Sequence, residues 1–169
     1  MAKIEAPLEA QIPGRTCPID YFLDAAAFRK APTLRADLLY VVGGLYGNTV
    51  ALDALMKLFE SEPCKSKLLV LNGDFHWFDR DPMEFLRVEQ LTARYVRLRG
   101  NVETELARDN SLPGCGCAYP PQVDDDTVGR SNQILAKLKL TAQQLGADKT
   151  LLGLPMVAVA TVGMCRIAI

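Results

Sequence analysis

Three apolar runs of strand length, each followed by a polar turn and a helical pattern, constrain the fold of this chain most strongly. They are ADLLYVV (36–42), KLLVLNG (67–73) and YVRLRGN (95–101). Continuous apolar runs are typical of strands that are buried on both faces of a parallel sheet. Because helical patterns separate the runs, the sequence predicts an α/β protein with a mainly parallel sheet.

The helical patterns between the runs have recognisable ends. Asn48 is a good N-cap, and apolar residues then recur at helical spacing until Pro63 ends the pattern. A second helix is predicted at 81–95, with Pro82 in its first turn. A third helix begins in VETELARD (102–109).

Two more helices are predicted outside this core. YFLDAAAF (21–28) predicts a short helix, and 127–146 predicts an amphipathic helix that starts near Ser131. The acidic run at 124–126 is interpreted as solvated, with a calcium site as the alternative. The run lacks the spaced ligand pattern of a calcium-binding loop.

We interpret the chain as a single domain, 1–169. An N-terminal arm (1–37) would pack on a βαβαβ core (38–110). A loop rich in Pro, Gly and Cys (111–126) follows, and then one helix and the C-terminal strands (127–169).

The C-terminal segment predicts a β-hairpin with strands at 156–162 and 165–169 around Gly163. The sequence stops within the second strand, and an unpaired edge strand invites aggregation. Three expectations remain open: an incomplete product without a function of its own, pairing with a second copy or a partner chain, or a strand inside the sheet.

Composition restricts the partners and the compartment. The net charge is −1, with 19 basic and 20 acidic residues, which gives no reason to expect nucleic acid or an anionic membrane. No apolar run approaches the roughly 20 residues of a transmembrane helix. Because the first 15 residues carry no apolar signal core, we expect a cytoplasmic protein whose five cysteines are reduced.

The polar segments that follow the three predicted strands are the candidate functional loops. They read GGLYGN (43–48), NGDFHWFDRD (72–81) and RGNVETE (99–105). The carboxyl ends of parallel strands lie at one edge of the sheet, so we expect these loops to converge there.

The order and spacing of these loops resemble the metallophosphoesterase (calcineurin-like phosphoesterase) superfamily over roughly residues 36–107. GLYGN (44–48) stands where that family has D-x-H-G-N. GDFHWFD (73–79) is similar to G-D-x-x-D, and GNVE (100–103) is similar to G-N-H-[DE]. The resemblance implies part of an αββα sandwich that ends in a hairpin. It also implies two divalent metals that activate water for phosphoester hydrolysis.

Carried over residue by residue, the resemblance implies a partial metal site. Asp74 matches the Asp that bridges the two metals, and Asn101 matches a ligand of the second metal. Gly44 replaces the first Asp ligand and Tyr46 replaces the first His ligand. A phenol binds most divalent metals poorly, and two oxygen ligands alone hold a divalent ion weakly.

Other departures concern the remaining positions of the motifs. Val102 replaces the His that would assist the leaving group, and Trp77 takes the place of the later Asp in the second motif. An active enzyme would need a rebuilt site with Mn, Fe or Zn. Its ligands would come from Tyr46, Asp79 or Glu103, with His76 as a ligand or catalytic group; the alternative is that no metal binds.

The second hypothesis is a non-catalytic module that binds a phosphate-bearing ligand or a protein. Gly44 would then open room where a metal would sit. Gly44, Gly47 and Asn48 would cradle the phosphate through free N–H groups. The alternative for these glycines, together with Gly43, is a tight turn that needs positive φ.

Several candidate residues have structural alternatives. Asp74 is either a metal ligand or a cap for a turn. His76, the only histidine, is either functional or packed between aromatic residues. Glu103 and Glu105 are either ligands or a base, or acids in the first turn of a helix, where they favour the dipole.

Cys115 and Cys117 form a C-x-C pattern. With Cys17, Cys64 or His76 they would make a soft-metal site, although C-x-C is not the usual C-x-x-C spacing. A redox pair and buried structural thiols are the other interpretations.

Overall fold

The computed structural model describes residues 12–17, 21–108 and 114–169. These residues form an α/β protein with five α-helices, a parallel three-stranded sheet and a mixed three-stranded sheet that ends in a C-terminal hairpin. The predicted fold class is confirmed. The expectations for residues 1–11, 18–20 and 109–113 lie outside the described residues.

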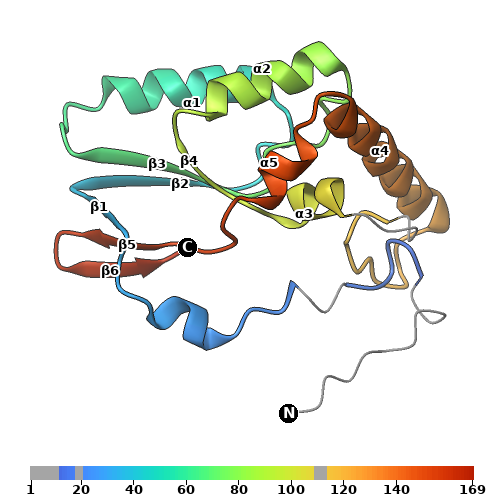
Figure 1. Ribbon diagram of the computed structural model, residues 1–169, viewed down its shortest axis with the longest axis horizontal. Helices are drawn as coiled ribbons and strands as arrows, with labels where there is room; N and C mark the ends of the chain where they lie inside the picture. The colour runs from blue at the N-terminus through green and yellow to red at the C-terminus, as the bar shows by residue number, and fades with distance from the viewer. Residues whose placement is uncertain (1–11, 18–20, 109–113) are drawn as a thin grey trace.

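The parallel sheet is the centre of the molecule, with strand order β2-β3-β4. It consists of β2 (Leu38–Val42), β3 (Lys67–Asn72) and β4 (Val96–Leu98). Helices α1 (Thr49–Ser61) and α2 (Pro82–Thr92) connect the strands and cover one face of the sheet (Figure 1). Asn48 caps α1 and Pro82 opens α2, as the sequence predicts.

The mixed sheet lies on the opposite side of the parallel sheet from α1 and α2 (Figure 1). Strand β1 (Leu34–Ala36) pairs in parallel with β5 (Val159–Val162). Strand β6 (Cys165–Ala168) pairs antiparallel with β5, which confirms the predicted hairpin. In the order β1-β5-β6, β6 is an outer strand, so the expectation that the last strand lies inside the sheet is wrong.

The prediction of one continuous strand at 36–42 is also wrong. Ala36 ends β1 and Leu38 begins β2, and the two strands belong to different sheets. Asp37 separates them, and its N–H donates to the carbonyl of Ser66 at 2.8 Å. The expected full burial of this run is not observed either, because β2 is an outer strand of the parallel sheet and Val41 is 46% exposed.

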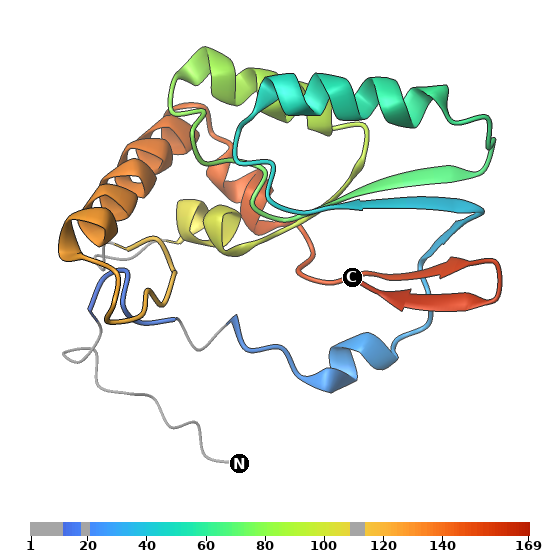
Figure 2. The same ribbon diagram turned by 180° about the vertical axis from the view of Figure 1, so that it is seen from behind.

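Three helices gather at the carboxyl ends of β2, β3 and β4, as the view from behind also shows (Figure 2). They are α3 (Asn101–Ala107), α4 (Asp125–Gln144) and α5 (Asp148–Leu152). α4 starts well before the expected position near Ser131, because the Asp124 carboxylate accepts the N–H of Thr127 at 2.8 Å and caps the helix. α5 is not among the elements that the sequence predicts.

The N-terminal arm contributes β1 and packs on the rest of the molecule. The Arg15 guanidinium donates to the carbonyls of Pro120 and Val123 and pairs with Asp125 at 2.6 Å. The short helix expected at 21–28 is a 3-10 helix at Ala25–Arg29.

Two apolar clusters lie on the two faces of β3. Leu69 and Leu71 face α1 and α2, whereas Val70 packs with Leu98 and Ala158 on the side of the mixed sheet. This alternation follows from the two-residue period of a strand, and it explains why the middle of β3, residues 68–71, is apolar on both faces.

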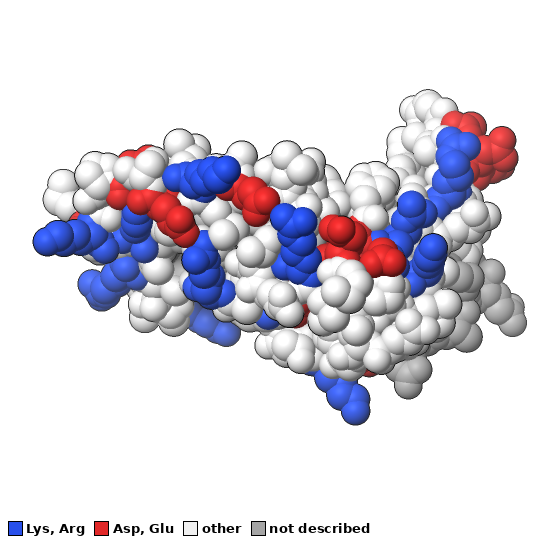
Figure 3. Space-filling view, turned by 90° about the horizontal axis from the view of Figure 1, so that it is seen from above, with Lys and Arg blue, Asp and Glu red and all other residues white. Residues whose placement is uncertain are grey.

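The outer face of α1 and α2 carries intermixed charges (Figure 3). Arg87 pairs with Asp53 at 3.1 Å and Arg94 pairs with Glu60 at 2.7 Å. Charges of both signs therefore balance locally on this face. Within the described residues, no helix is long and apolar enough to cross a membrane.

We predict that Leu138→Ala lowers the free energy of unfolding by about 2–5 kcal/mol, because Leu138 is fully buried on α4 and the change leaves a cavity. Leu140→Ala is the matched control on the same helix. Leu140 is 60% exposed, so the loss should stay within about 0.5 kcal/mol. Urea unfolding measures both, and equal losses would contradict the packing of α4.

Candidate functional site

The loops after β2, β3 and β4 converge, as predicted. A Cβ atom built on Gly73 would lie 2.6 Å from the Cα of Gly100, so the ends of β3 and β4 are in backbone contact. The loop after β2 joins them, because Tyr46 N–H donates to the carbonyl of Asp74 at 3.0 Å and Gly47 N–H to that of Phe75 at 2.8 Å.

A cavity of about 400 Å³ opens at this junction. Three predicted site residues line it: Asp74, Asn101 and Tyr46. The other lining residues are Trp77, Phe78, Val102, Cys117 and Tyr119. Of these, the sequence offers only Cys117 as a ligand, in the alternative of a soft-metal site. In the sequence, the one indication that Trp77 and Phe78 could contact a ligand is that they are aromatic residues in a strand-end loop. Nothing in the sequence links that loop to the segment of Cys117 and Tyr119.

Asp74 borders the cavity and also supports α3. Its Oδ1 accepts the N–H of Val102 at 3.1 Å, and its backbone adopts a left-handed φ of 53°. A Cβ atom on Gly100 would lie 2.2 Å from this oxygen, so only glycine fits there. Burial raises the pKa of Asp74, against the opposing effect of hydrogen bonds from the Val102 and Asn101 backbone. Both alternatives for Asp74 thus retain support: it caps a helix and it faces a ligand-sized space.

The side chains of Asn101 and Tyr46 are in contact with neighbouring parts of the chain. The side-chain amide of Asn101 donates to the carbonyl of Cys115 at 3.2 Å and to the Cys117 sulfur at 3.8 Å, which fixes the Cys loop beside α3. The ring of Tyr46 lies over Gly44, so that a Cβ atom on Gly44 would meet Tyr46 Cε2 at 2.7 Å. The expectation that Gly44 opens room for a ligand is therefore wrong, because the Tyr46 ring occupies that room.

The geometry of the first loop favours a tight turn over an anion cradle. The N–H groups of Tyr46 and Gly47 already donate to the loop after β3, and Asn48 N–H donates to Leu45 at 3.1 Å. The Asn48 side chain accepts the N–H of Ala51 at 2.9 Å and caps α1. Gly47 is needed because a Cβ atom there would lie 2.5 Å from Asp79.

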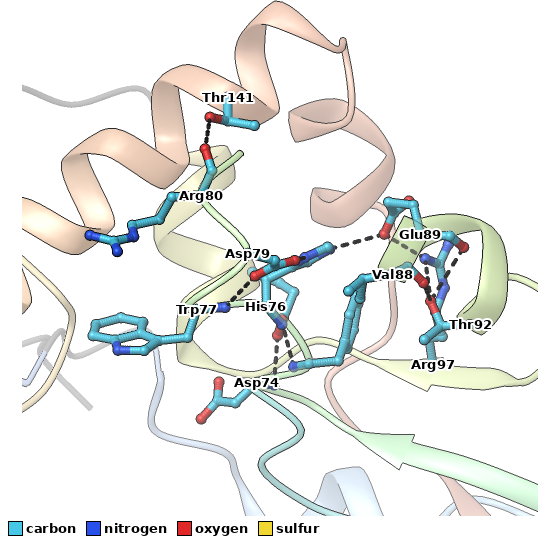
Figure 4. A network of polar contacts seen from close by, with 12 residues as sticks. Asp74, His76, Trp77, Asp79, Arg80, Val88, Glu89, Thr92, Arg97 and Thr141 are labelled. Carbon is cyan, nitrogen blue, oxygen red and sulfur yellow. Dashed lines mark hydrogen bonds and ion pairs between the residues drawn. The ribbon is translucent and has the colours of Figure 1, made fainter. Parts of the chain in front are cut away.

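His76 lies in the core and not in the cavity. It is fully buried, and its ring stacks on Phe85 with centroids 4.0 Å apart. Its Nδ1 contacts Asp79 Oδ2 at 2.5 Å and its Nε2 contacts Glu89 Oε1 at 3.1 Å. Figure 4 shows the side chains of Asp74 and Trp77 pointing away from this ring. The catalytic role predicted for His76 is therefore not supported by its position.

The electrostatics explain why this buried ring is protonated. Burial lowers the pKa of His76, but the hydrogen bonds to Asp79 and Glu89 and the nearby Glu103 raise it more, to about 9. Burial likewise acts to raise the pKa of Glu89, yet His76 and Arg97 hold it below its usual value. Arg97 donates to the same Glu89 oxygen at 2.7 Å and extends the network to β4.

The carboxylates of Asp79 and Glu103, the alternative metal ligands, are also occupied by hydrogen bonds within the protein. Asp79 Oδ1 accepts the N–H of Trp77 at 2.8 Å, while Oδ2 bonds His76. Glu103 is fully buried, and burial raises its pKa. Its two oxygens accept four backbone N–H groups, those of Asp74, Phe75, His76 and Gly100. Glu105 bonds the Tyr21 hydroxyl and the Arg108 guanidinium.

The cysteine pair lies beside the cavity. Cys115 is buried, and Cys117, whose thiol donates to the Cys115 carbonyl at 3.5 Å, lines the cavity. The hydrogen bond between the two thiols and burial raise the pKa of Cys117, so it is a neutral thiol. Within residues 12–17, 21–108 and 114–169, no group of three or more His, Cys, Asp or Glu side chains could hold a metal ion. The described residues therefore do not fit the two-metal centre that the resemblance implies.

Comparison of the sequence with protein-family models gives no match, and comparison with curated proteins gives none either. The resemblance to metallophosphoesterases stays a prediction.

We predict that His76 titrates with a midpoint near 9 instead of its ordinary 6.5. Because the pKa is raised on folding, the stabilisation is fully present below pH 6.5 and is lost as the pH rises through about 9. The chain has one histidine, so its imidazole NMR signals are unambiguous. In parallel, the free energy of urea unfolding should fall over this pH range, and the fall should be smaller in His76→Gln. A midpoint at or below 6.5 would contradict the buried ion pair.

We predict that Gly44→Ala lowers the free energy of unfolding by at least about 1–2 kcal/mol, because φ is +59° and the Tyr46 ring must move. Gly43→Ala is the matched control, since no atom lies within 4 Å of the added Cβ. Its effect should stay within about 0.5 kcal/mol. Equal effects in urea unfolding would show that the Tyr46 ring does not occupy the place of a side chain at 44.

Proposed function

We propose that this chain is a non-catalytic binding module that holds a small organic ligand in the cavity at the carboxyl ends of the parallel strands. The observation that carries the proposal is the lining of this cavity. Of the described residues that line it, four are aromatic and one, Asp74, is charged, at the place where the resemblance would put a metal centre.

Metal-assisted hydrolysis is the weaker candidate. It needs two ions, held by several ligands, to activate water and neutralise the phosphoryl oxygens. Asp74 and Asn101 border the cavity, but the other candidates, His76, Asp79 and Glu103, use their polar atoms in bonds that hold the loops together. Two ligands leave most of the coordination sphere of a divalent ion to water.

Binding of a small organic ligand is favoured by the size and chemistry of the site. Pockets for such ligands are concave, mainly apolar, and carry a few placed polar groups. Tyr46, Trp77, Phe78 and Tyr119 supply flat apolar surface, and Asp74, Asn101 and Cys117 supply polar atoms. A phosphate group fits less well without a metal, because the part of the lining that the structure describes includes no Lys or Arg and Asp74 would repel it.

The position of the only tryptophan makes the proposal testable, because Trp77 lines the cavity. We predict that benzyl alcohol, as a neutral aromatic probe, shifts the Trp77 fluorescence in a saturable way. Phe78→Ala should weaken this binding at least threefold, since Phe78 lines the cavity. Phe22→Ala should not, because Phe22 is 87% exposed and is not part of the lining.

Hydrolysis is tested on the same samples. With MnCl₂ added, the protein should turn over bis(4-nitrophenyl) phosphate no faster than Asp74→Ala does. Manganese-dependent turnover that is lost in Asp74→Ala would overturn the proposal in favour of a hydrolase. A Trp77 signal that responds to no organic probe would overturn the binding module itself.

A further inference from the structure

The charge on the described lining of the cavity is negative. Among the described residues that line it, Asp74 is the only charged one, and its side chain is partly buried. Among the described residues, no Lys or Arg forms an ion pair with Asp74, and the hydrogen bonds that lower its pKa come from backbone N–H groups. A partly desolvated carboxylate without a counter-ion favours a ligand that brings a positive charge.

The aromatic side chains add to this preference. Tyr46 comes from the loop after β2, Trp77 and Phe78 come from the loop after β3, and Tyr119 comes from the segment before α4. The face of each ring carries negative potential and attracts a cation by about 0.5–2 kcal/mol, most strongly for Trp. Four rings and one carboxylate that line the same cavity therefore favour a positively charged ligand.

The carboxylate is also held in place. Asp74 Oδ1 accepts a hydrogen bond from the Val102 N–H, and the Asp74 N–H donates to the Glu103 carboxylate. Gly100 lies against the Asp74 side chain. Asp74 therefore cannot turn away when the cavity is empty, so little conformational entropy is lost when a ligand binds.

A bare divalent ion does not satisfy this environment. Hard cations need several oxygen ligands, and Asp74 is the one carboxylate among the described lining residues. The tyrosine hydroxyls bind most divalent ions poorly. A cation with its own apolar surface gains both from the rings and from Asp74.

We propose that the cavity selects a small organic cation, a quaternary ammonium or a protonated amine, over a neutral or anionic molecule of the same shape. This inference rests on the proposed function, namely that the cavity binds a small organic ligand. It adds the chemical class of that ligand, and it assigns Asp74 as the counter-charge.

Choline and 3,3-dimethylbutan-1-ol form a matched pair of probes, because they share one shape and differ in the charged nitrogen. We expect choline chloride to bind at least tenfold more tightly than the alcohol, as measured by Trp77 fluorescence at constant chloride concentration. Sodium phosphate should cause no saturable change. Asp74→Asn should reduce the affinity for choline at least fivefold and leave that for the alcohol unchanged.

Two further variants keep the test decisive if Asp74→Asn disturbs α3. Phe78→Leu keeps an apolar side chain but removes a ring, so it should weaken choline more than the alcohol. Asp126→Asn removes an exposed carboxylate in the first turn of α4 and should change neither affinity.

The outcomes separate the two proposals. If the alcohol binds as tightly as choline, the cavity is a binding site without preference for cations and the inference fails alone. The inference also fails alone if Asp74→Asn and Phe78→Leu both leave the choline-to-alcohol affinity ratio unchanged. If neither probe nor benzyl alcohol binds, the proposed function fails and the inference fails with it.

Discussion

The carboxylate of Glu103 is the constraint on which the candidate site depends. It is fully buried and accepts N–H groups from the loop after β3 and from Gly100 at the end of β4. Burying a carboxylate costs several kcal/mol unless hydrogen bonds compensate for the lost water, and four backbone donors provide that compensation. The same bonds fix the left-handed backbone of Asp74 and close the contact between Gly73 and Gly100. Without Glu103, the loop after β3 would lack the anchor that directs Asp74 toward the cavity.

The loop after β3 divides its side chains between two environments. Phe75, His76 and Asp79 turn into the core, where the imidazolium of His76 lies between Asp79 and Glu89. The Trp77 side chain turns away from the His76 ring (Figure 4), and Trp77 and Phe78 line the cavity with Asp74. His76 and Asp79, which the sequence offers as a catalytic group and a metal ligand, therefore support the loop. Trp77 and Phe78 of the same segment line the cavity that we propose as the binding site.

The sequence predicts the elements of this fold better than its site, for physical reasons. Strand period, the Asn48 cap and Pro82 act locally, so β3, α1 and α2 could be predicted from short windows. The break at Asp37 depends on a tertiary hydrogen bond to Ser66, and no local pattern shows it. The role of His76 depends on which way its side chain turns after β3 ends, where the two-residue period no longer applies. Glu103 lies in the first turn of α3, as one of its two interpretations expects, but its bonds to the loop after β3 depend on the tertiary fold. Tyr119 reaches the cavity from a segment that only the tertiary fold brings near.

Gly44 and Tyr46, the two departures from the metallophosphoesterase pattern in the first loop, are structurally coupled. The Tyr46 ring lies where a side chain at 44 would begin, so an Asp at 44 and the present position of the ring exclude each other. If the resemblance holds, replacement of the Asp by glycine and of the His by tyrosine is one change of the site and not two independent losses. Under the resemblance, that change would remove two metal ligands, and Tyr46 now lines the same cavity as Asp74. The carboxylate of Asp74, which would bridge the metal ions under the resemblance, shares the cavity with four aromatic side chains. A cation that carries its own apolar surface, which is the ligand we propose, would complement both the charge and the rings.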